Sequence, residues 1–279
     1  MIAVWFFNIR LLFIIGIAMG LSGSDVAKEA ADIVLLNDNF ASIVNAVEEG
    51  RAIFQNIRKF LTYVLVHNVA ELAPYLAFAL LKIPLPLTPI QIFAVDMGTD
   101  TLTALGLGVE PVDPQVMREP PRPRKERLLD RSLALRAYLL LGIIEATAVM
   151  SAYFFVLSMG GWRYGQVLPP GNILGLQATT ASLAAIFVMQ SINVFLCRSD
   201  IRSVFSMPLL NNRLIVWGVA LELVLLMIFV YTPLGNTLLQ TSPLPGQSWL
   251  VLLPFSIGIF LLEEARKCIA RWLIRKKHK

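Results

Sequence analysis

Six stretches of this 279-residue chain are apolar over nearly the length that a membrane-spanning helix needs, which is about 20 residues. They are residues 60–81, 89–109, 137–158, 177–197, 214–232 and 248–262. The last stretch is short and contains Pro254, so we expect it to continue into the amphipathic tail that begins at Glu263. The pattern predicts an all-α polytopic membrane protein with six transmembrane helices.

The charged residues support this class and predict its orientation. They make up 15% of the chain, whereas soluble domains have about 25%. Of the 24 lysines and arginines, all but Lys82 and Arg163 lie before the first stretch or after the second, fourth and sixth. By the positive-inside rule we predict a multi-pass protein of the cell membrane with both termini in the cytoplasm. Topology explains the net charge of +5, so no nucleic-acid partner is expected.

Residues 16–58 have a different pattern. We expect a strand ending at residues 16–20, a short helix at 24–31, a strand at 33–36 and, from Phe40 onward, a helix that runs toward the membrane. This α/β piece is too short to hold a core of its own. Residues 1–15 form an apolar run that contains Asn8 and Arg10, and we interpret it as a buried strand or a non-native start rather than a signal peptide or seventh span.

Carboxylates within the first two stretches predict a cation site. Glu71 lies in the first, and Asp96 and Asp100 lie four apart in the second. An ionised carboxylate at the bilayer centre costs roughly 2.5 kcal/mol or more. Three of them in adjacent helices repel one another unless a cation joins them. The alternative, left open for Asn68 and Thr99 in particular, is that each polar group only bonds a neighbouring helix.

The backbone near these carboxylates favours the same interpretation. Pro74 removes a helical hydrogen bond and frees the carbonyl of Ala70. Gly98, between the two aspartates, suits a helix that unwinds locally. Freed carbonyls and carboxylates are ligands for Na⁺, K⁺, Ca²⁺ or Mg²⁺, and broken helices often form ion sites.

Weaker candidates lie in the later stretches. Gln190 and Asn193 share one face of the fourth, and Glu222 lies inside the fifth. Hydrogen bonds between helices are an equal alternative for Gln190 and Asn193. For Glu145, in the third stretch and one or two turns from the membrane edge, we expect a structural role.

Several motifs resemble a known family. Gly16-Ile-Ala-Met-Gly20 and the residues from Gly23 to Asp32 resemble the end of the phosphorylation domain of P-type ATPases. Asn68-Val-Ala-Glu71 and Asp96-Met-Gly-Thr-Asp100 resemble the fifth and sixth transmembrane helices of the type II branch, the sodium/potassium- and calcium-pump-like enzymes. The loop 110–122 is similar to the one that docks on the phosphorylation domain.

This resemblance implies three parts. Residues 1–15 have no match in the family. Residues 16–58 would be a remnant of the phosphorylation domain with the stalk helix. Residues 59–279 would be the C-terminal cation-transporting membrane domain, with its six spans equivalent to helices 5–10 of the pump.

The resemblance also implies ligands. The positions that match cation ligands are Asn68, Glu71, Asp96, Thr99 and Asp100. Tyr63, Asn193 and Glu222 match the additional sodium site of the sodium pump, and Gln190 shares a helix face with Asn193. His67 stands where the sodium pump has a serine, which puts potassium counter-transport in doubt. It is either a titrating counter-charge or a buried neutral group.

The chain departs from the family in lacking the aspartyl-phosphate motif Asp-Lys-Thr-Gly-Thr, the motif Gly-Asp-Gly-x-Asn-Asp and the nucleotide-binding domain. We therefore expect no catalytic residue, no cofactor in this chain and no ATP hydrolysis by the chain alone. ATP and Mg²⁺ would be used by the missing part of the pump, carried on a separate chain. Two alternatives remain, namely a stand-alone secondary cation transporter or channel and a non-catalytic remnant of a broken pump gene.

Overall fold

The computed structural model describes residues 15–118, 120–121, 123 and 127–277, without the side chains of Thr99 and Lys277. The interpretation of the N-terminal run concerns residues that, apart from Ile15, lie outside this description. The chain divides into two compact units. Unit 1 is Met1–Ala52 with Val112–Pro120, and unit 2 is Ile53–Pro111 with Pro121–Lys279.

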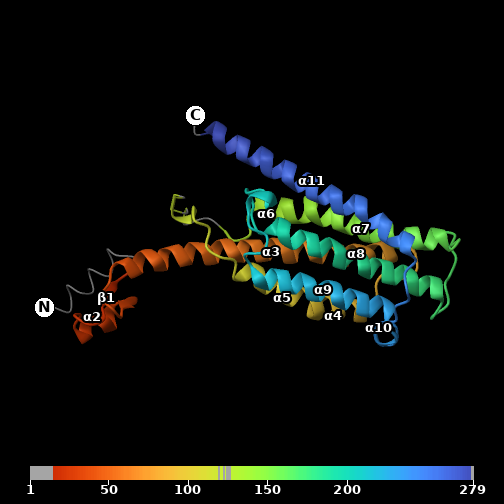
Figure 1. The fold of residues 1–279 in the computed structure, drawn as a ribbon, viewed down its shortest axis with the longest axis horizontal. Coiled ribbons are helices and arrows are strands. Elements are labelled where there is room, and N and C mark those ends of the chain that lie inside the picture. The colour runs from red at the N-terminus through yellow and green to blue at the C-terminus, as the bar shows by residue number, and fades with distance from the viewer. Residues whose placement is uncertain (1–14, 119, 122, 124–126, 278–279) are drawn as a thin grey trace. The chain divides into compact units, whose positions relative to one another are not determined.

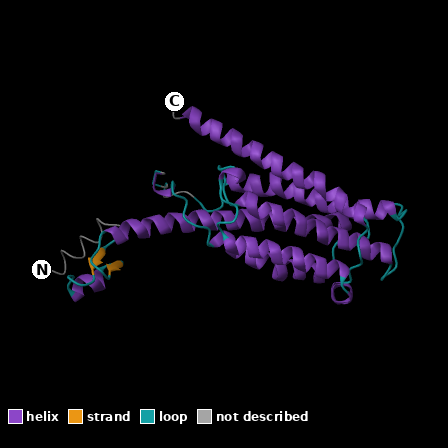
Figure 2. Cartoon of the chain, in the orientation of Figure 1, coloured by secondary structure: helices purple, strands orange, loops and turns teal. Residues whose placement is uncertain are grey.

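Unit 1 contains the expected strand–helix–strand segment. β1 (Ile17–Met19) pairs in parallel with β2 (Ile33–Leu35), and α2 (Asp25–Ala30) connects them (Figure 2). The carboxylate of Asp38 accepts hydrogen bonds from the backbone nitrogens of Leu21 at 2.8 Å and Ser22 at 2.7 Å. The Ser22 hydroxyl and these backbone donors hold the pKa of Asp38 below its usual range. The unit also includes the short helix η2 (Val116–Arg118).

Unit 2 is a bundle of helices (Figure 1). Its elements, with α3 entering from unit 1, are α3 (Ala41–Leu81), α4 (Pro89–Val95), η1 (Asp96–Asp100), α5 (Thr101–Gly108), α6 (Arg131–Ala134), η3 (Leu135–Gly142), α7 (Ile143–Met159), α8 (Ile173–Cys197), η4 (Val204–Ser206), α9 (Arg213–Tyr231), α10 (Pro233–Leu239) and α11 (Gly246–Lys277).

Five helices in the described part of the chain are long and apolar enough to cross a membrane. They are Ala41–Leu81, Arg131–Met159, Ile173–Cys197, Arg213–Tyr231 and Gly246–Lys276. Each contains most or all of one predicted span, and α11 passes through Pro254 into the tail as expected. α3 likewise continues through Pro74.

The predicted span 89–109 is not among these five, because it consists of three successive helical segments. Thr88 and Gln91 form a capping box that begins α4, with Pro89 in its first turn. At Asp96 the chain enters η1, a π-helical turn, and α5 follows at Thr101. The regular α-helical winding is therefore lost around Gly98, but the backbone stays helical as a wider π turn instead of becoming non-helical.

α8 lies at the centre of the bundle. Four alanines, Ala178, Ala181, Ala184 and Ala185, are buried along it and pack into one core cluster with residues of α7 and α9. Small side chains allow helices in membranes to approach closely. Figure 1 shows α7 and α8 side by side along their length.

Contacts between helix α3 and the loops lie at the two ends of unit 2. At one end Tyr164 donates to the carbonyl of Leu81 at 2.7 Å. At the other, Arg58 of α3 pairs at 3.0 Å with Asp130, which caps α6. Burial raises the pKa of Asp130, but the backbone N–H of Leu133 and the guanidinium of Arg58 lower it more, so the pKa lies below its usual range.

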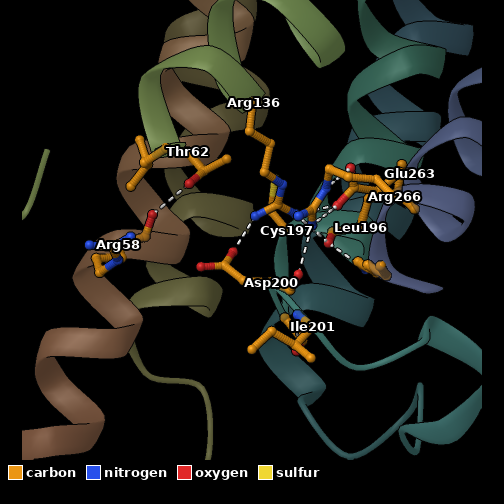
Figure 3. Close-up of polar contacts among 12 residues, drawn as sticks. Arg58, Thr62, Arg136, Leu196, Cys197, Asp200, Ile201, Glu263 and Arg266 are labelled. Atoms are coloured by element: carbon orange, nitrogen blue, oxygen red, sulfur yellow. Dashed lines mark hydrogen bonds and ion pairs between the residues drawn. The ribbon is translucent and has the colours of Figure 1, made fainter. Parts of the chain in front are cut away.

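A buried charge cluster closes the second end (Figure 3). Arg136, counted as a loop residue in the sequence, lies in η3 and is 7% exposed. Its guanidinium contacts Asp200 and donates to Glu263 of α11 at 2.7 Å. Arg266 also pairs with Glu263, at 2.8 Å. These contacts hold α11 against η3 and the segment that follows α8.

Candidate cation site

Four titratable side chains from α3 and η1 meet inside unit 2. Nε2 of His67 lies 3.1 Å from Oε1 of Glu71, 3.4 Å from Oδ1 of Asp96 and 3.2 Å from Oδ2 of Asp100. His67 is 2% exposed. One imidazole nitrogen therefore faces three carboxylates.

Local structure explains this meeting. His67 and Glu71 are four residues apart on α3, so they lie on the same helix face. Asp96 and Asp100 begin and end the π turn of η1, and both approach α3 there. Single π turns inside helices are frequent at functional sites.

The imidazole cannot satisfy all three carboxylates at once. Nε2 carries at most one proton, and of the three contacts the one to Asp96 has hydrogen-bond geometry. Oε1 of Glu71 and Nδ1 of His67 are buried without a hydrogen-bond partner among the described residues. The cluster thus has more negative charge than its own nitrogen can balance.

Tyr63 extends the cluster to α8. Its hydroxyl, fully buried, lies 3.1 Å from Oδ1 of Asp100, 3.0 Å from Oγ1 of Thr103 and 3.3 Å from Oε1 of Gln190. Asn193 lies one turn farther along α8, where its Oδ1 accepts from Sγ of Cys197 at 3.6 Å. The tyrosine connects α3, η1 and α8 at the centre of the bundle.

The structure brings together most of the predicted ligands. Glu71, Asp96 and Asp100 surround His67, while Tyr63 and Gln190 are linked to Asp100 by hydrogen bonds.

The remaining predicted ligands lie outside these direct contacts. Asn68 is exposed and takes no part in the contacts around His67. Thr99 lies in η1, and its side chain is outside the described part. Glu222 of α9 is fully buried, and neither of its side-chain oxygens has a hydrogen-bond partner among the described residues.

Two titratable residues of the bundle interior, His67 and Glu145, were not among the predicted ligands. The sequence did not show that His67 lies at the centre of the site, because spacing alone does not show which way an imidazole points. Glu145, expected to have a structural role, is fully buried on α7, and neither of its oxygens has a hydrogen-bond partner among the described residues. A carboxylate inside an apolar helix was the available signal.

The donor set determines what the site can hold. Carboxylate oxygens are the ligands that hard cations prefer. Ligand atoms of His67, Asp96 and Asp100 lie within 4.8 Å of one another, close enough to share one ion. The side chain of Asp96 is 53% exposed, so the cluster is closed toward α8 and open on another side.

Comparisons with known proteins show which family the chain resembles. Residues 84–269 match the family described as "Cation transporting ATPase, C-terminus". The chain is 36% identical to the sodium/potassium-transporting ATPase subunit alpha-4 of Homo sapiens, 35% to alpha-3 of Rattus norvegicus and 36% to alpha-2 of Gallus gallus. Each comparison covers 92% of this chain, but only 27% of the human relative and 28% of the other two.

The chain thus spans little more than a quarter of the length of these relatives. Its apolar helices and their similarity to pump subunits make it a multi-pass membrane protein. The chain belongs to the type II cation-transporting P-type ATPases and corresponds to their C-terminal region.

Proposed function

We propose that this chain is the cation-binding membrane domain of an ATP-driven cation pump. The observation that carries the proposal is the cluster of three carboxylates around Nε2 of His67, inside a bundle that belongs to this family. In this proposal α4, η1 and α5 together form a sixth span, and both termini face the cytoplasm. The transported ion is Na⁺, K⁺ or Ca²⁺.

The predicted ligands divide into two groups in this proposal. Glu71, Asp96 and Asp100 bind the ion directly, and Asn68 and Thr99 complete the site on its open side. Tyr63, Gln190, Asn193 and Glu222 serve a second position deeper in the bundle. Support comes from the hydrogen bonds that link Tyr63 to both Asp100 and Gln190.

Coupling to ATP would use parts outside this chain. We propose that residues 16–58 correspond to the end of the phosphorylation domain and the stalk helix, and that the loop 110–122 docks on that domain. ATP and Mg²⁺ would act there, and the chain alone would supply ligands and coupling surfaces without hydrolysing ATP. The strand–helix–strand segment of unit 1 supports this assignment.

Thermal unfolding of the purified chain in lipid nanodiscs tests the proposal. A bound ion stabilises the folded state by about 2.7 kcal/mol at a hundred times its dissociation constant. We expect Na⁺, K⁺ or Ca²⁺ to raise the Tm, and Asp100→Asn to abolish that rise. Asp25→Asn is the matched control, because the carboxylate of Asp25 is 97% exposed on α2. An equal rise for wild type and Asp100→Asn would contradict the proposed site.

A further inference from the structure

His67 adds a nitrogen atom to the carboxylate oxygens of the cluster in unit 2. Its Nε2 lies 3.1 Å from Oε1 of Glu71, 3.4 Å from Oδ1 of Asp96 and 3.2 Å from Oδ2 of Asp100. The proposed function assigns the ion to the three carboxylates and gives the imidazole no part in binding it. Spacing, charge and the kind of donor together indicate that the nitrogen is a ligand as well.

The spacing fits a small metal ion. Bonds from such an ion to imidazole nitrogen and carboxylate oxygen are about 2.0–2.2 Å long. Neighbouring ligand atoms therefore lie about 3.0 Å apart at right angles and about 3.4 Å apart at tetrahedral angles. The three distances from Nε2 to the carboxylate oxygens fall in this range. Ligand atoms of His67, Asp96 and Asp100 also lie within 4.8 Å of one another, so small side-chain movements let one ion contact all three.

The charges favour a divalent ion. The side chain of His67 is 2% exposed, and those of Glu71 and Asp100 are each 13% exposed. Beside a neutral imidazole, a monovalent cation balances one of the three carboxylate charges, whereas a dication balances two. The dication thus leaves less uncompensated charge in the interior, where such charge is strongly destabilising. It would also pair Oε1 of Glu71, which is buried without a hydrogen-bond partner among the described residues.

The nitrogen distinguishes among divalent ions. Ca²⁺ and Mg²⁺ take oxygen ligands, whereas imidazole is a usual ligand of transition metals, and carboxylates suit Mn²⁺. Nε2 faces all three carboxylates, so a metal bound there would replace the proton that this nitrogen can carry. The ring proton would then lie on Nδ1, and no hydrogen bond from a described residue opposes that tautomer.

The cluster is accessible to such an ion. The side chain of Asp96 is 53% exposed, so the cluster is open on the side of this carboxylate. A metal ion can enter there, and water can complete its coordination. Na⁺, K⁺ and Ca²⁺ could use the same opening, but they would bind the carboxylate oxygens without the nitrogen.

We propose that His67 determines which ion this site prefers, because its Nε2 binds the ion directly together with the three carboxylates. The preferred class is a divalent metal ion of the first transition row, for which Mn²⁺ and Zn²⁺ are the probes. Na⁺, K⁺ and Ca²⁺ bind the same site more weakly. This inference rests on the proposed function and adds a class of ion to the hard cations named there.

Pulsed electron paramagnetic resonance of Mn²⁺, bound to the full chain in nanodiscs, tests the proposal directly. An imidazole nitrogen bound to Mn²⁺ modulates the electron spin echo. The chain has two histidines, His67 and His278, and a purification tag without histidine adds none. We expect the nitrogen signal in wild type and in His278→Ala, the matched control. The signal should be lost in His67→Gln, whose amide oxygen would be a hard ligand in place of Nε2.

Affinities of the same variants test the preference. Equilibrium dialysis gives the dissociation constants of Mn²⁺, Zn²⁺ and Ca²⁺ for each variant. We expect wild type and His278→Ala to bind Mn²⁺ and Zn²⁺ at least about tenfold more tightly than Ca²⁺. His67→Gln should lose about tenfold in affinity for Mn²⁺ and keep its affinity for Ca²⁺. Equal Mn²⁺ affinities of wild type and His67→Gln would overturn the proposal.

The outcomes separate this inference from the proposed function. Mn²⁺ bound without a nitrogen signal, or with one that disappears in His278→Ala, overturns the role of His67. A rise in Tm with Na⁺, K⁺ or Ca²⁺, without binding of Mn²⁺ or Zn²⁺, overturns this inference and leaves the proposed function standing. The absence of binding by any of these ions overturns both. If His67→Gln fails to fold, the nitrogen signal in wild type and in His278→Ala decides.

Discussion

At the scale of single residues, His67 is the basic group among the carboxylates of the candidate site. Its Nε2 lies within 3.4 Å of carboxylate oxygens from α3 and η1. Without that nitrogen, three carboxylates would face one another in a site where His67 itself is almost completely buried. We propose that the imidazole holds the cluster together when no ion is bound, and that a bound cation takes over part of that role.

Replacing His67 tests this role. We expect His67→Leu, which is neutral and of similar volume, to lower stability without added ions by about 3–5 kcal/mol, the usual cost of removing one partner of a buried pair. A bound cation should restore more stability to this variant than it adds to wild type. Thermal unfolding with and without ions measures both effects. His278→Ala, which changes the other histidine of the chain, is the control, and equal Tm values for His67→Leu and wild type would contradict the role.

Arg198 and Glu110 form a second buried ion pair. Arg198 donates to Oε1 of Glu110 at 2.6 and 2.8 Å, and Asn212 donates to Oε2 at 2.6 Å. Because both charges are nearly buried, Glu110→Gln should cost about 3 kcal/mol by leaving Arg198 uncompensated. The double variant with Arg198→Met should recover part of that loss. Denaturant unfolding checks this cycle, and strictly additive losses would argue against a coupled pair.

At the scale of elements, α5 must pack closely on α9. A Cβ on Gly106 would lie 2.7 Å from Cγ1 and 3.1 Å from the backbone nitrogen of Ile215, whereas a Cβ on Gly108 of the same helix meets nothing within 4 Å. We expect Gly106→Ala to destabilise the bundle by about 1–3 kcal/mol, the usual range for overpacking. Gly108→Ala, the matched control, should be neutral or slightly stabilising. Equal Tm values for the two variants would show that α5 and α9 do not pack tightly at Gly106.

Most elements could be predicted from the sequence, but the π turn could not. Long apolar runs predict the helices of a membrane bundle, and the strand, helix and strand expected between residues 16 and 36 correspond to β1, α2 and β2. Hydropathy does not distinguish an α turn from a π turn, so η1 was expected to be unwound backbone. The same limit applies to the site, because acidic residues in apolar runs identified Glu71, Asp96 and Asp100, while the inward direction of Glu145 depends on how α7 packs on α8.

At the scale of the whole molecule, the loops alternate between the two ends of unit 2. Tyr164 and Leu81 meet at one end, while Arg58 and Asp130 meet at the other. We predict that the end with Asp130 faces the cytoplasm, because the lysines and arginines are concentrated in the loops of that end.

Cysteine labelling in cells checks this orientation. In a background with Cys197 and Cys268 replaced by alanine, Val167→Cys should react with an impermeant maleimide in intact cells. Arg127→Cys should react only after permeabilisation. Val167 is 87% exposed in the loop between α7 and α8, which makes it accessible to the reagent. The reverse labelling pattern would contradict the proposed topology.

The central claim is that the carboxylates around His67 bind the transported cation, and locating a heavy cation in crystals of the chain tests it most directly. Tl⁺ scatters anomalously and resembles K⁺ in charge and size, while Mn²⁺ serves in the same way for a divalent ion. The account predicts an anomalous peak among Glu71, Asp96 and Asp100 that disappears in Asp100→Asn. Peaks confined to surface carboxylates, with none inside the bundle, would contradict it.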